Sequence, residues 1–299
     1  MKKLSINIYD AIPVYGLDRA FEMCKKSGFD AIDFDLSYYS LEKGIYAASD
    51  DEFEEHFHNI RKTAGKYDLV VGQTHGRCET YDPVDESRYE WTHKITEKDM
   101  KASAILGAPS CVVHFINTTR WGKKTPELMR SVSDEMFANI IPFAEQYKVN
   151  IAIETFGAAR IKGERIRDFF ADHNEFLGQF DRMNTQYKTM CVDTGHIHEA
   201  GSFWVLPVDE YIRALGKNIT LLHLHDNCGH WDDHQLPGTG TVKWRPVFEA
   251  LEDIGYNGTY NCELNLMRYG NCIEEFLEFA GKYMRKFVDN RGDLTGQAI

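Results

Sequence analysis

Side chains that bind metal ions or transfer protons recur at one kind of place in this sequence, the end of a short apolar segment. Six such segments finish with a histidine, an aspartate or a glutamate: 72–75, 111–114, 151–154, 191–196, 222–226 and 261–263. Taken singly, a histidine there is usually an ordinary hydrogen-bonded residue, and a carboxylate is usually a helix N-cap or a salt-bridge partner. Six in succession are different, because burying so many ionisable groups without partners costs several kcal/mol per charge. A divalent cation removes that cost, so the pattern predicts a metal site.

Two sets of ligands are compatible with the sequence. The first combines three carboxylates with one imidazole: Glu154, Asp193, His223 and Glu263. This oxygen-rich set favours a hard ion, with Mn2+ as the first choice, Mg2+ or Co2+ as alternatives and Zn2+ less favoured. The larger set adds His75, His114, His196, Asp232 and His234. Its five imidazoles and four carboxylates have room for two or three ions and suit zinc better.

The elements that must position these residues alternate between short β-type segments and longer amphipathic ones. Eight strands are expected, at 3–9, 31–36, 69–75, 110–115, 150–155, 189–194, 219–226 and 258–265. Helices are expected between them, at 17–27, 52–67, 88–106, 126–147, 165–180, 208–215, 246–254 and 273–287. The alternation predicts an α/β fold with parallel strands, and eight units without a linker favour a closed (β/α)8 TIM barrel over an open doubly wound sheet. Chemistry in such barrels lies at the carboxyl ends of the strands.

Length, charge and composition narrow the class of protein. The 299 residues suit one barrel of roughly 250 residues with modest insertions, so residues 1–299 are expected to form a single domain with a loosely held tail from about 289. The net charge of −12 argues against a nucleic-acid partner, which needs a basic footprint. Seven scattered cysteines without a CxxC pair argue against a disulfide framework.

The chain is expected to be cytoplasmic. Its start is too polar for a signal peptide, and no stretch reaches the roughly 20 apolar residues of a membrane span. A homo-oligomer is compatible with the sequence.

At the residues described above, the chain resembles the xylose isomerase-like TIM-barrel superfamily. This superfamily contains sugar phosphate isomerases and epimerases, inosose dehydratases and the endonuclease IV enzymes of AP endonuclease family 2. The resemblance covers nearly the whole chain, and its most specific motifs lie at 153–155, 192–196, 223–227, 232–240 and 262–265.

The resemblance implies two different metal sites. Epimerase-like members place one ion on the positions of Glu154, Asp193, His223 and Glu263, and the position of His196 contacts substrate. Endonuclease-like members hold three ions, and all nine of their ligand positions have a counterpart here, including His75, His114, Asp232 and His234. Two departures favour a sugar enzyme: residues 155–160 replace the glycine- and asparagine-rich stretch of the nucleases, and residues 236–240 look like those of the sugar-acting members.

For a sugar or polyol isomerase or epimerase, the expected mechanism is proton abstraction next to a carbonyl through an enediolate. Glu154 and Glu263 are the expected acid/base pair, and His196, helped by His225, is expected to hydrogen-bond the developing oxyanion. Arg160, Trp121 and Trp231 are candidate substrate-binding residues, although solvated loops and ordinary loop packing explain them as well. The alternatives are metal-assisted phosphodiester hydrolysis of endonuclease IV type, a dehydratase or lyase on the same fold, and a metal-binding sensor without activity.

Overall fold

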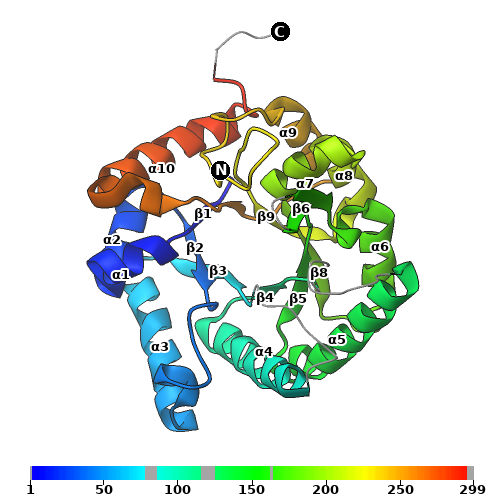
Figure 1. Cartoon of the computed structure of the whole chain (residues 1–299). Coiled ribbons are helices and arrows are strands. Elements are labelled where there is room, and N and C mark those ends of the chain that lie inside the picture. Colours follow the sequence, from blue (N-terminus) through cyan, green and yellow to red (C-terminus); the bar gives the residue numbers. More distant parts are fainter. Residues whose placement is uncertain (1, 78–85, 116–124, 162–163, 295–299) are drawn as a thin grey trace.

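The fold is a barrel of parallel strands inside a ring of helices (Figure 1). The computed structural model describes residues 2–77, 86–115, 125–161 and 164–294, and the side chains of 86–89 and 159–161 lie outside this description. The barrel strands are β1 (Leu4–Asn7), β2 (Ala31–Asp35), β3 (Val70–His75), β4 (Ser110–Val113), β5 (Asn150–Glu154), β8 (Lys188–Asp193), β9 (Ile219–His223) and β10 (Tyr260–Cys262). All eight coincide with expected strands.

The strands follow one another round the barrel in chain order. The sheet runs β10-β1-β2-β3-β4-β5-β8-β9, and neighbouring strands in it pair in parallel. The last gap is bridged by Leu224, which pairs in parallel with Cys262 just beyond β9. The expected TIM barrel is therefore confirmed.

The helices lie in a ring outside the barrel (Figure 1). They are α1 (Ile12–Tyr15), α2 (Leu17–Lys26), α3 (Asp50–Lys66), α4 (Glu86–Leu106), α5 (Pro126–Tyr147), α6 (His173–Arg182), α7 (Thr194–Ala200), α8 (Val208–Leu215), α9 (Trp244–Asp253) and α10 (Ile273–Asp289). The start of α3 shows why a helix begins at that residue. The Ser49 side chain accepts from the Glu52 amide and Glu52 reaches back to Ser49, which satisfies amide groups left open at a helix start.

One expected helix is wrong at its beginning. Residues expected to start a helix at 165 instead form β7 (Glu164–Arg167), which pairs antiparallel with β6 (Ala158–Ile161) in a two-stranded hairpin. The helix, α6, begins only at His173, where the side chain of Asp172 accepts from the Asn174 amide as an N-cap. Pairing with β6 therefore prevails over the amphipathic pattern of this stretch.

The two halves of the barrel interior differ in polarity. Four buried residues from neighbouring strands form an apolar layer: Val112, Ala152, Cys191 and Leu221. On the other side, the buried side chains of Asp33, Gln73 and Asn261 contact one another from β2, β3 and β10. Gln73 and Asp33 of this polar half contact His223, the last residue of β9.

Two further expectations concern cysteines and membranes. Six cysteines lie in the described part of the chain; all are free thiols, four of them buried. None of the helices within the described ranges has the length and apolarity needed to cross a membrane.

Candidate functional site

The strand ends bring together the four residues expected to share one ion. Glu154, Asp193 and His223 are the last residues of β5, β8 and β9, and Glu263 follows β10. Parallel register sets Asp193 opposite His223. One ligand atom from each of the four lies within 4.8 Å of the others.

The imidazole of His223 is the centre of this group. Its Nδ1 lies 2.5 Å from Glu154 Oε1, 2.9 Å from Glu263 Oε2 and 3.9 Å from Asp193 Oδ2. The opposite ring nitrogen, Nε2, faces away from these carboxylates, toward Gln73 and Asp33. Three carboxylates thus converge on one nitrogen of a fully buried ring.

The second oxygens of the two glutamates point toward another pair of histidines. Glu154 Oε2 lies 2.6 Å from His114 Nε2 and 3.7 Å from His75 Nε2. Glu263 Oε1 is 4.0 Å from the same nitrogen of His75. His75, the last residue of β3, therefore stands between the outer oxygens of both glutamates, and His75, His114 and Glu154 make a second group able to hold an ion.

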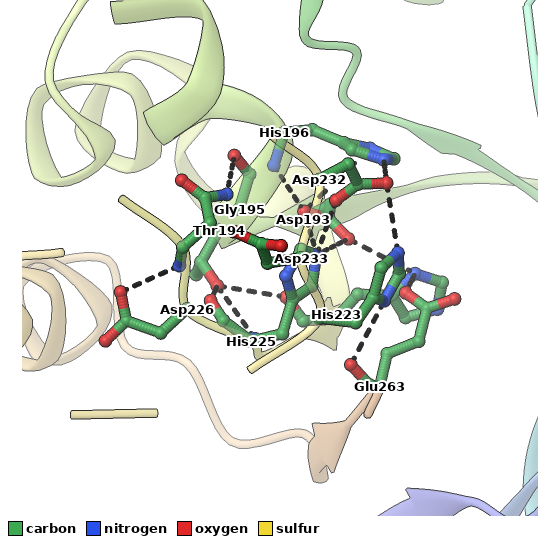
Figure 2. A network of polar contacts seen from close by, with 12 residues as sticks. Asp193, Thr194, Gly195, His196, His223, His225, Asp226, Asp232, Asp233 and Glu263 are labelled. Atoms are coloured by element: carbon green, nitrogen blue, oxygen red, sulfur yellow. Dashed lines mark hydrogen bonds and ion pairs between the residues drawn. The ribbon is translucent and has the colours of Figure 1, made fainter. Parts of the chain in front are cut away.

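A third group surrounds Asp232 in the loop after β9 (Figure 2). The carboxylate of Asp232 lies 3.0 Å from His234 Nε2 and 3.3 Å from His196 Nε2. His225 Nε2 lies 2.9 Å from Asp193 Oδ1, and its ring stacks on that of His234 at 4.1 Å. The structure thus joins all the histidines and carboxylates of the larger expected ligand set into one continuous network.

A buried aspartate holds the loop that carries Asp232 and His234. The carboxylate of Asp226 accepts from the amides of Asn227, Gly238 and Val242 and from the indole of Trp244. Gly238 has φ +88°, in the left-handed region that favours glycine. The Gly238-Thr239-Gly240 segment is thus a turn that folds around Asp226. Through these hydrogen bonds Asp226 holds the loop of Asp232 and His234 in place without belonging to the ligand set.

Burial and charge oppose each other in the four-residue group. Burial raises the pKa of Glu154, but the imidazoles of His223 and His114 outweigh it and hold the pKa well below its usual range. Burial lowers the pKa of His223, and surrounding groups, Glu263 and Glu154 among them, raise it well above its ordinary value. The neighbouring Cys191 thiol stays neutral, because burial raises its pKa to about 12. Glu154 is therefore ionised, and a proton on His223 compensates its charge.

The four-residue group fits a divalent cation. Ligand distances of about 2.0 to 2.2 Å place opposite ligand atoms about 4 Å apart, and the four atoms here satisfy that spacing within 4.8 Å. No lysine or arginine of the described ranges forms an ion pair with Glu154, Asp193 or Glu263. Three carboxylates whose ion-pair partners among the described residues are all imidazoles are a donor set that a cation completes.

Of the three expected substrate-binding residues, only Trp231 has a described side chain. Trp231 precedes Asp232 in the same loop, and 60% of its surface is exposed. Trp121 lies outside the described residues, and Arg160 belongs to β6 with its side chain outside the description.

Three residues near the site escaped the sequence analysis. Asp33, Gln73 and Asn261 lie in the barrel interior, and both amides donate to Asp33 Oδ2, at 3.1 and 2.9 Å. The available signal was a charged residue in the middle of an apolar strand, Ala31-Ile32-Asp33-Phe34.

The comparisons with known proteins agree with this architecture. A family model described as "Xylose isomerase-like TIM barrel" matches residues 21–280. The uncharacterized protein y4fM of Sinorhizobium fredii is 26% identical over 198 residues, which are 61% of this chain and 57% of that protein. The chain thus spans little more than half the length of this relative.

Two further similarities extend over most of the chain. The inosose isomerase of Bacillus velezensis is 25% identical over 273 residues, 88% of each chain. A crystal structure of the IOLI protein with a bound zinc atom is similar with a TM-score of 0.74 at 19% identity, covering 97% of this chain and 99% of the other. From the matched residues 21–280, the chain belongs to the xylose isomerase-like TIM barrel family.

Proposed function

We propose that this protein is a metal-dependent sugar or polyol isomerase or epimerase that moves a proton next to a carbonyl. The observation that carries the proposal is the convergence of Glu154, Asp193, His223 and Glu263 within 4.8 Å. The similarity to an inosose isomerase over 88% of the chain supports this reaction class. Mn2+ is the preferred ion because the set is rich in carboxylate oxygens.

The same four residues would hold the ion. When bound, it polarises a substrate carbonyl and the neighbouring hydroxyl and so acidifies the intervening C–H bond. Glu154 and Glu263 each keep one oxygen against His223 and turn the other toward His75. These outer oxygens accept the proton on one side and return it on the other, through an enediolate.

His196 is the proposed hydrogen-bond donor to the developing oxyanion. Burial lowers its pKa, but Asp193 and Asp232 raise it well above the ordinary value, so the ring carries both protons. Its Nδ1–H donates to the carbonyl of Thr155 at 3.0 Å, and its Nε2–H, which lies 3.3 Å from Asp232 Oδ2, is the donor that would turn to substrate. His225 is fully buried against Asp193, so its contribution is to orient that carboxylate.

The test is solvent deuterium exchange on a panel of ketoses, inososes and their phosphates. Each compound is incubated with the Mn2+-loaded protein in D2O, and NMR follows loss of the C–H signal and formation of the isomer. Glu154→Gln should abolish exchange while leaving the unfolding midpoint close to that of the wild type. The control, Glu249→Gln on the surface of α9, should retain full activity. Near-normal exchange by Glu154→Gln would refute the assigned role.

One observation keeps a second function open. His75 and His114 contact Glu154, and His196 and His234 contact Asp232, so the larger ligand set is assembled as well. Metal analysis separates the two: about one ion per chain supports the sugar enzyme, and about three, with nicking of an abasic DNA duplex, supports a nuclease. Loss of water from a panel compound would instead identify a dehydratase.

A further inference from the structure

A buried carboxylate lies behind the proposed metal site, on the side of His223 away from the ligand set. Asp33, in the middle of β2, is fully buried. Its Oδ2 lies 3.5 Å from His223 Nε2 and accepts from the amides of Gln73 and Asn261. Among the described residues, His223 is its only ion-pair partner.

Ordinary folding requirements do not account for this carboxylate. Within the described part of the chain, Asp33 Oδ1 and Asn261 Oδ1 are buried without a hydrogen-bond partner. A buried charge with an unsatisfied oxygen destabilises a fold. Such a group in a barrel interior indicates a function other than stability.

The chemistry of the imidazole supplies that function. If Nδ1 of His223 binds an ion, it cannot carry a proton, so the proton of the neutral ring must sit on Nε2. Asp33 Oδ2 faces that nitrogen at 3.5 Å. The Gln73 amide, whose Nε2 lies 2.9 Å from the same nitrogen and 3.1 Å from Asp33 Oδ2, can only donate, so a proton on His223 Nε2 would replace the Gln73 contact and be directed to Asp33. A carboxylate that accepts from the second nitrogen fixes the orientation of a ligand histidine and strengthens it as a donor.

We infer that Asp33 is a positioning residue of the metal site, which holds His223 with Nδ1 toward Glu154, Asp193 and Glu263. Gln73 and Asn261 in turn hold Asp33 by donating to its Oδ2. This inference rests on the proposed metal site and adds to it a part of the barrel that touches neither ion nor substrate.

The test is Asp33→Asn, which keeps the shape of the side chain and removes its charge. Calorimetry measures Mn2+ affinity, and thermal melting measures the stability of the metal-free protein. The expected result is Mn2+ binding weakened about 10- to 100-fold with an unchanged or raised melting temperature. A purely structural role predicts the reverse: a lower melting temperature and unchanged affinity.

Two further variants make the result specific. Asp168→Asn alters another buried aspartate, which caps the amide of Phe170, and should lower stability while leaving Mn2+ affinity intact. Asn261→Leu removes one of the amides that hold Asp33 and should weaken Mn2+ binding in the same direction, which tests the idea even where Asp33→Asn fails to fold. Wild-type protein that binds no divalent ion would overturn the proposed function. If the wild type binds Mn2+ and both Asp33→Asn and Asn261→Leu bind it with the same affinity, this inference is overturned but the proposed function stands.

Discussion

Position 195, a glycine, has no room for a side chain. It lies in the first turn of α7 between Asp193 and His196. A Cβ added there would lie 1.9 Å from Cε1, 2.4 Å from Nδ1 and 2.7 Å from Nε2 of His225. Carbon atoms pack at about 3.5 to 4.0 Å, so Gly195→Ala forces the buried ring to move by about 2 Å.

The displacement removes two contacts of His225 and strains its surroundings. The ring leaves its stack on His234 and its 2.9 Å contact with Asp193. Overpacking of a tight interior costs about 1 to 3 kcal/mol, and loss of a hydrogen bond to a charged group costs about 1.5 to 3 kcal/mol. Gly195→Ala should therefore lower the free energy of unfolding by about 2.5 to 6 kcal/mol.

Urea unfolding of the metal-free protein measures this loss, and calorimetry measures the accompanying fall in Mn2+ affinity. Gly65→Ala is the matched control, because position 65 lies within α3 and nothing stands within 4 Å of an added Cβ. The same substitution there should stabilise the protein by about 0.5 to 1 kcal/mol. If Gly195→Ala unfolds at the wild-type urea midpoint, the placement of His225 against Asp193 is wrong.

Three other predictions concern metal, pH and capping. Adding Mn2+ at about 100 times its Kd to metal-free protein should stabilise it by about 2.7 kcal/mol, and a chelator should reverse this; an unchanged melting temperature would contradict it. Burial raises the pKa of Asp99 from 3.8 to about 7, so the protonated form is favoured on folding. The stability gained from the protonated form is present below pH 3.8 and is lost as pH rises through about 7. Over this range the free energy of unfolding of the wild type, measured with urea, should fall by about 4 kcal/mol relative to that of Asp99→Asn. Ser49→Ala, which breaks the capping box of α3, should cost about 1 kcal/mol in the same assay, and a smaller loss for an exposed Ser131→Ala provides the reference.

Local patterns in the sequence were enough to predict most of the barrel. The strands are short and buried, so their apolar runs stand out from the amphipathic helices around them. α5 and α8 begin and end where they were expected, at Pro126–Tyr147 and Val208–Leu215. Because parallel strands of a barrel present their carboxyl ends at one face, the positions of Glu154, Asp193, His223 and Glu263 along the chain already predicted that they would meet.

Tertiary structure decided what local patterns cannot encode. Residues 164–167 pair with β6 rather than continuing as a helix, since strand pairing depends on a partner and not on the periodicity of one segment. Asp33 meets Gln73 and Asn261 across 40 and 228 positions of sequence. The contact with Asn261 arises only when β10 pairs with β1 and closes the barrel, because β2 lies on the other side of β1. The residues at the mouth of the barrel follow from strand order, whereas those that support them from inside follow from how the closed barrel packs.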